Sequence, residues 1–146
     1  MFKTAIEARK ALQSKEISAK ELVDLSYKKI DEVENDIQAL NSLTKDLAYN
    51  TAKIVDEKIK NGENVPALAG IPLVLKDNIC VKDTLTTASS KMLENFVSPY
   101  NATVANKLIN ENLIPIVAKA NLDEFAMGSS TENSAFKVTK NTLNLK

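Results

Sequence analysis

The sequence predicts an α/β fold in which N-terminal helices are followed by the first strands and helices of an incomplete mixed sheet. Apolar residues recur at helical spacing through residues 5–60. Short apolar runs at residues 73–75 and 113–118 have the length of buried strands, and the segment between them is long enough for a crossover helix that would make them parallel. We assign residues 1–62 to a helical region and residues 63–146 to the start of the αβ core of a single domain.

Capping-box pairs mark two helix starts. Thr4 with Glu7, and Ser18 with Glu21, each place a hydroxyl and a carboxylate three residues apart, which satisfies free amides at a helix N-terminus. After Ser18, one set of apolar residues follows helical spacing: Leu22, Leu25, Ile30, Val33 and Ile37. We expect these side chains to form one buried stripe, opposite a charged face that is solvated.

The remaining elements follow from shorter patterns. A weak strand is expected over residues 39–43 and a third helix over residues 45–60, which Gly62 ends. The inward residues of that helix are expected to be Leu47, Thr51, Ile54, Val55 and Ile59. Residues 89–96 suit a helical turn, and we expect Asn101 to cap a helix that carries Val104, Leu108 and Ile109 on one side.

The composition excludes several kinds of site. Nineteen basic and nineteen acidic residues leave a formal net charge of zero, so no overall field favours nucleic acid or an anionic membrane. With no histidine and the single cysteine Cys80, the chain lacks the residues for a zinc site, a serine–histidine triad or an internal disulfide. Acid–base chemistry would fall to a lysine or a carboxylate. No apolar run has the length of a signal peptide or membrane span, so we expect no membrane contact and a cytoplasmic location.

The stretch from Gly70 to Asn78 is the part of the chain best suited to hold a reactive group. A turn glycine precedes an apolar run that we expect to be buried on both faces. Lys76 and Asp77 follow at the end of that run, where open α/β sheets place groups that contact ligands. A lysine there either extends its amine into water along an apolar surface or holds it in a desolvated pocket.

Two motifs resemble the amidase signature family. Residues 68–78 match its Leu-Ala-Gly-Ile-Pro, apolar run and Lys-Asp-Asn pattern, and residues 121–134 resemble the A subunits of glutamyl-tRNA(Gln) amidotransferases in particular. The resemblance implies an amidase-signature mixed sheet and a triad of a lysine, a serine in a cis peptide bond and a nucleophilic serine. Lys76 matches the lysine, and Met127, Gly128, Ser129 and Ser130 match residues that line the substrate pocket. A lysine acting this way must be neutral, which requires burial; an amine in bulk solvent far from Gly128 would argue against this interpretation.

The resemblance weakens after Phe136, where the family has glycine and this chain has Lys137. Both catalytic serines of the family lie beyond this point, and no matching segment is present. We therefore expect the chain alone to be inactive. Ser129 and Ser130 are expected to satisfy loop backbone groups rather than act as nucleophiles, and Asp77 to be a structural hydrogen-bond partner. We expect Asp123 to cap or pair at the next helix start.

By resemblance, the function is hydrolysis of glutamine to supply ammonia, which converts Glu-tRNA(Gln) to Gln-tRNA(Gln) in translation. The implied partners are the B and C subunits, with tRNA reached only through the complex. No cofactor is expected in this chain, because ATP and magnesium would be used by a partner subunit. Two alternatives remain: a free-standing amidohydrolase of the same family, and a fragment that binds partner subunits without catalysis.

Overall fold

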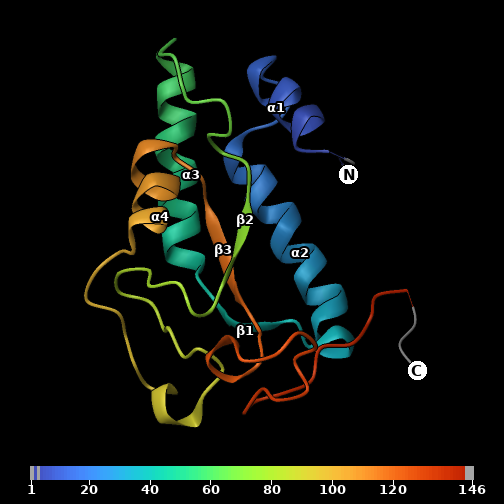
Figure 1. Cartoon of the computed structure of the whole chain (residues 1–146). Helices are drawn as coiled ribbons and strands as arrows, with labels where there is room; N and C mark the ends of the chain where they lie inside the picture. The colour runs from blue at the N-terminus through green and yellow to red at the C-terminus, as the bar shows by residue number, and fades with distance from the viewer. Residues whose placement is uncertain (1, 3, 144–146) are drawn as a thin grey trace.

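The computed structural model describes residue 2 and residues 4–143 of the chain. Figure 1 shows a small sheet with long helices running alongside it and irregular segments gathered at one end. The α-helices are α1 (Ala5–Gln13), α2 (Ala19–Ile37), α3 (Lys45–Lys60) and α4 (Thr103–Asn106). The strands are β1 (Leu40–Leu43), β2 (Leu73–Lys76) and β3 (Ile116–Ala120). Three short helical turns complete the set of elements: η1 (Lys91–Leu93), η2 (Lys107–Glu111) and η3 (Glu124–Ala126).

The caps expected at the first two helices are confirmed. The Thr4 side chain accepts a hydrogen bond from the backbone amide of Glu7 at the start of α1. At the start of α2, Ser18 and Glu21 form a complete capping box. The carboxylate of Asp56, on α3, also accepts hydrogen bonds from the amides of Ala19 and Lys20, at 2.7 and 3.1 Å. The first turn of α2 is therefore joined to the middle of α3.

The sheet has the strand order β1-β3-β2. β3 is the central strand; it pairs antiparallel with β1 and parallel with β2. The parallel pairing of β2 and β3, expected from the length of the connection between them, is confirmed. In this register Lys76 lies opposite Ala120, so both strands end at the same edge of the sheet. Although β1 comes from the helical N-terminal region, it belongs to the same sheet.

Two apolar clusters hold these elements together. One packs α1, α2 and α3 against β3 and contains Leu12, Val23, Val55 and Val117 among its buried residues. The other packs α4 and η2 against β2 and β3 and contains Leu75, Ile109 and Ile116. Gly70 lies where the chain passes closest to α1, α2 and α3: a Cβ atom there would lie 2.9 Å from the Cβ of Ala19. The turn before β2 therefore depends on glycine.

Several details differ from the sequence-based expectations. β2 is not buried on both faces, because it is an edge strand; Leu73 and Val74 are 36% and 41% exposed. Asn101 does not cap the following helix; its side-chain oxygen instead accepts a hydrogen bond from the amide of Lys82 at 2.7 Å. Leu25 and Ile54, expected to point inward, are exposed. These positions depend on tertiary neighbours, which periodicity alone does not reveal.

Candidate active site at the ends of the parallel strands

Lys76 is the last residue of β2 and lies next to the segment that follows β3. Its side chain is exposed, and within the described part of the chain it makes no hydrogen bond or ion pair. The expected desolvation of this amine is therefore wrong for the chain as described. The physical reason is the same as for Leu73 and Val74: among the described residues, no further strand pairs with the free edge of β2.

Asp77, the next residue, is fully buried and joins four segments of the chain. One carboxylate oxygen accepts hydrogen bonds from the side chain of Asn41, at 2.9 Å, and from the amide and hydroxyl of Thr87. Its backbone amide donates to the carbonyl of Ala120 at 3.0 Å. The expectation that Asp77 is a structural hydrogen-bond partner is confirmed. These contacts fix the backbone immediately after Lys76.

The other carboxylate oxygen of Asp77 lies 3.2 Å from the Nζ atom of Lys119, and both side chains are 0% exposed. Lys119 also donates hydrogen bonds to the carbonyl of Leu85 and the hydroxyl of Thr86, at 3.1 and 3.2 Å. Burial lowers the pKa of the Lys119 amine, and the attraction of Asp77 opposes that change. The buried lysine of this region is thus Lys119, on the strand beside Lys76.

Sequence reasoning missed Lys119, although a signal was present. Both β2 and β3 are short apolar strands with a lysine near the end, and the lysine of β3 has alanine on either side. An isolated lysine within a central buried strand needs a buried partner, because an unpaired charge there is costly. The carboxylate of Asp77, at the end of the neighbouring parallel strand, is that partner.

A second group of buried polar residues connects this edge of the sheet to the C-terminal segment. The Ser89 hydroxyl accepts hydrogen bonds from Asn41 and from the amide of Leu122, and donates to the side-chain oxygen of Asn121. The Asn121 amide group donates to the Lys137 carbonyl at 2.8 Å. Ala88 and Ser89 both have positive φ, at 48° and 54°, a conformation that costs energy for residues other than glycine. The hydrogen bonds around them hold this strained loop in place.

The loop that follows β3 is organised by Asp123. Its carboxylate accepts backbone hydrogen bonds from Ser130, Thr131 and Asn133, each within 3.0 Å. These bonds lower the pKa of the Asp123 carboxyl. Asp123 was expected to cap or pair at the next helix start; it does precede η3, but its side chain binds the loop rather than the helix.

The residues expected to line the substrate pocket lie inside this loop. Met127, Gly128, Ser129 and Ser130 are all exposed, and Met127 is 76% exposed. Gly128 packs directly against Asp123: an added Cβ atom would lie 2.5 Å from the Cγ of that residue. The register of β2 and β3 places the start of this loop at the same edge of the sheet as Lys76.

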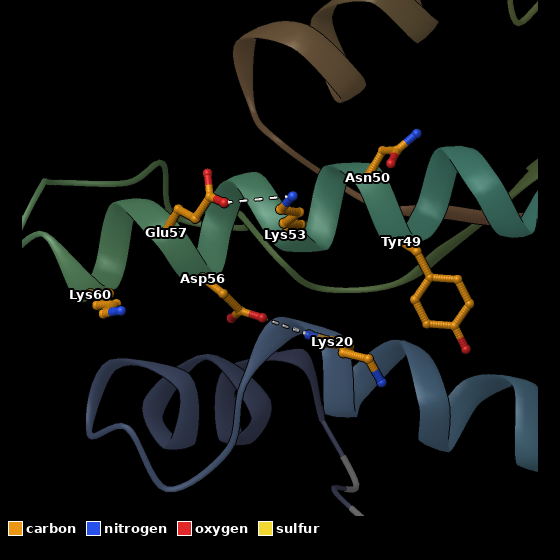
Figure 2. A pocket seen from close by; sticks show the side chains of 7 residues that line it. All are labelled: Lys20, Tyr49, Asn50, Lys53, Asp56, Glu57 and Lys60. Carbon is orange, nitrogen blue, oxygen red and sulfur yellow. Dashed lines mark hydrogen bonds and ion pairs between the residues drawn. The ribbon is translucent and has the colours of Figure 1, made fainter.

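A surface cavity of about 410 Å³ lies elsewhere, along α3 and the start of α2. Figure 2 shows its lining: Lys20 from α2 and Tyr49, Asn50, Lys53, Asp56, Glu57 and Lys60 from α3. Several of its charged groups already have partners in the chain. The Asp56 carboxylate accepts a hydrogen bond from the Lys20 backbone amide at the start of α2. The Lys53 Nζ atom lies 3.9 Å from the Glu57 Oε1 atom, and the Lys20 ammonium lies over the Tyr49 ring. None of the sequence-predicted site residues contributes to this cavity.

Other kinds of site find no support in the described residues. Among them, no group of three or more potential metal ligands comes together. In the described residues, 2 and 4–143, no helix has the length and hydropathy needed to cross a bilayer. The features that stand out are therefore an accessible amine at the end of β2, a rigid polar network directly behind it and a glycine- and serine-containing loop at the same edge. An amine that becomes neutral in such a place can accept a proton from a hydroxyl.

Comparison with known proteins identifies the family. The sequence model of the amidase family matches residues 21–146. The A subunit of the glutamyl-tRNA(Gln) amidotransferase of Thermoanaerobacter pseudethanolicus is 56% identical over 142 residues, which are 97% of this chain and 29% of that protein. The chain thus spans under a third of the length of such relatives.

Solved structures agree with this result. The A subunit of the glutamyl-tRNA(Gln) amidotransferase from Thermotoga maritima is 33% identical, with a TM-score of 0.66 over 88% of this chain and 28% of that one. A bacterial aryl acylamidase of the amidase signature family has a TM-score of 0.90 at 24% identity, over 98% and 30% of the two chains, and shows the likeness of the fold. Lys76 is exposed, but the sequence comparison nevertheless shows the family. By sequence and by fold, this chain belongs to the amidase family.

Proposed function

We propose that this chain forms the lysine-bearing part of a glutamine-hydrolysing A subunit of a glutamyl-tRNA(Gln) amidotransferase. The observation that carries the proposal is the 56% identity to such a subunit over nearly the whole chain. It is supported by the position of Lys76 at the end of β2, in register with the residue of β3 that precedes the Asn121–Ser134 segment.

In this proposal the Lys76 amine is the base. Once covered and neutral, it draws a proton, through one serine, from a second serine that attacks the carboxamide carbon of glutamine. The products are ammonia and an acyl-enzyme that water then hydrolyses. Met127, Gly128, Ser129 and Ser130 line the glutamine site. Because the serine pair of the family is not in this sequence, the chain alone is expected to release no ammonia.

The proposed setting is a cytoplasmic complex. The chain acts with the B and C subunits, and tRNA is reached only through that complex. ATP and magnesium are used by a partner subunit to activate the glutamyl group, so this chain needs no cofactor of its own. The zero formal net charge is consistent with an indirect role in binding tRNA.

A chimera tests the proposal. The chain replaces the matching 142 residues of the Thermoanaerobacter pseudethanolicus protein, which is then assembled with that organism's own partner subunits. We expect glutamine-dependent ammonia release, and a fall of about 10²- to 10⁴-fold in Lys76→Ala, the usual contribution of a general base. Lys82→Ala, also at an exposed lysine, is the matched control and should retain full activity. A folded, assembled chimera that is inactive, or one that does not need Lys76, would contradict the proposal.

A further inference from the structure

We infer that Asp123 is a positioning residue for glutamine: its carboxylate holds residues 127–131 in the shape that binds the substrate. Asp123 is only 3% exposed, so the affinity for glutamine depends on a side chain that the substrate does not touch. The inference rests on the proposed function, because the glutamine site is proposed to be lined by residues 127–130.

Both carboxylate oxygens of Asp123 are bound by the loop itself. The Oδ2 atom accepts hydrogen bonds from the backbone amides of Ser130 and Thr131, at 2.9 and 3.0 Å. The Oδ1 atom accepts from the backbone amide of Asn133 at 2.9 Å and from its side-chain amide at 3.3 Å. In the part of the chain that the structure describes, no lysine or arginine forms an ion pair with Asp123. The loop thus supplies the hydrogen bonds that replace water around this buried charge, and losing them would cost free energy.

The shape held in this way is not one that the backbone prefers. Phe125, Ala126 and Thr131 have positive φ angles of 52°, 63° and 71°. Residues other than glycine pay energy for this conformation, so it persists only where the surroundings fix it. Asp123 directly precedes the first two of these residues in the chain and binds the amide of the third. Its carboxylate is therefore placed to hold the strained backbone on either side of residues 127–130.

The stretch between the strained residues combines contact with the carboxylate and exposure to solvent. An added Cβ atom at Gly128 would lie 2.5 Å from the Asp123 Cγ atom and 2.7 Å from its Oδ2 atom. Residues 127–130 are nevertheless all exposed. The register of β2 and β3 places the start of this loop at the edge of the sheet that carries Lys76. A loop that is already fixed presents its groups to a ligand without first being ordered, which lowers the free-energy cost of binding.

A carboxylate that served stability alone would behave differently. Removing it would lower the free energy of unfolding, but the protein that remained folded would bind glutamine as before. If Asp123 positions the loop, removing its carboxylate lets the strained backbone relax, and only the fraction of molecules with the competent shape binds. The dissociation constant of the folded protein therefore separates the two roles.

The test measures the Kd for glutamine by isothermal titration calorimetry in the assembled chimera, with Lys76→Ala as the background. Because Lys76→Ala removes the proposed base, glutamine is bound but not consumed. We expect Asp123→Asn to raise the Kd about 10-fold, as for a loop whose competent shape falls to about a tenth of the population. Asp123→Ala, which leaves no acceptor for the loop amides, should raise the Kd further. Ser18→Ala, which weakens the cap of α2 outside the loop, is the control and should stay within about 2-fold of the background.

Circular dichroism establishes folding for each variant before titration. A Kd for Asp123→Asn within about 2-fold of the background would overturn the inference, because the carboxylate would then serve stability alone. If Asp123→Ala unfolds, Asp123→Asn decides; if both unfold, the carboxylate serves folding and the inference is wrong. A background chimera that binds no glutamine would also overturn it. A chimera that retains Lys76 and binds glutamine with this dependence on Asp123, yet releases no ammonia, would reject the proposed function and leave the inference standing.

Discussion

Replacing Gly70 by alanine should destabilise the chain far more than the same change at Gly62. Both glycines have left-handed backbones, with φ of +77° at Gly70 and +75° at Gly62. Either substitution therefore carries the cost of placing a Cβ in that region, about 1–2 kcal/mol. The two sites differ in their surroundings, which makes Gly62 a matched control.

The difference follows from the contacts of the added methyl group. At Gly70 it would lie 2.9 Å from the Ala19 Cβ, 3.1 Å from Val55 Cγ1 and 3.2 Å from Leu12 Cδ1, whereas at Gly62 nothing lies within 4 Å. Those three neighbours belong to the helices of the larger apolar cluster, so they have little freedom to move. Overpacking of this kind costs about 1–3 kcal/mol. The total loss at Gly70 is thus about 2–5 kcal/mol.

Urea unfolding followed by circular dichroism at 222 nm measures both variants against the parent. We expect the urea midpoint to fall for both variants. The free energy of unfolding should fall by about 1–3 kcal/mol more in Gly70→Ala than in Gly62→Ala. Equal losses would mean that the turn before β2 does not press against α1, α2 and α3 as described. A Gly70→Ala variant as stable as the parent would also refute the left-handed turn itself.

Three further changes test other parts of the fold. Ser18→Ala removes one half of the capping box of α2 and should lower the free energy of unfolding, measured with urea, by about 1 kcal/mol. Ser26→Ala, within the same helix, should lower it by less. Gly128→Ala would place a Cβ atom 2.5 Å from Asp123 Cγ, so it should displace the loop. Backbone amide hydrogen exchange at Ser130 and Thr131 should then become faster. Unchanged exchange would contradict the described packing. The Asp123 carboxyl has a folded pKa below its usual value; its contribution to stability is therefore present above the unfolded pKa of about 3.9 and lost as pH falls through the folded pKa. Asp123→Asn should lose that acid-dependent part, which unfolding curves between pH 6 and pH 2 would show.

The helices were predictable because their signals are local. The Ser18–Glu21 capping box and the spacing of apolar residues in α3 act within a few residues of each other, and the structure places both elements as expected. The parallel arrangement of β2 and β3 was also predictable, because the segment between them is long enough to hold a crossover helix.

What could not be predicted depends on which strand lies at the edge. The run Leu73–Leu75 has the composition of a strand buried on both faces, yet in the described part of the chain β2 pairs with β3 alone. Composition cannot distinguish a strand that has two neighbours from one that has a single neighbour. For the same reason the burial expected at Lys76 is found at Lys119, on the central strand. The solvent exposure of Lys76 could therefore not be predicted from the sequence.

The open side of β2 has a practical consequence for work with this polypeptide. Backbone amides and carbonyls along that side can pair with any extended segment that approaches, and the uncovered side chains of Leu73 and Val74 add apolar contact. Self-association should therefore rise with protein concentration and fall when Val74 is replaced by lysine, which opposes strand-to-strand adhesion. Dilute samples are therefore appropriate for spectroscopy. Light scattering across a concentration series will show the protein concentration at which self-association begins.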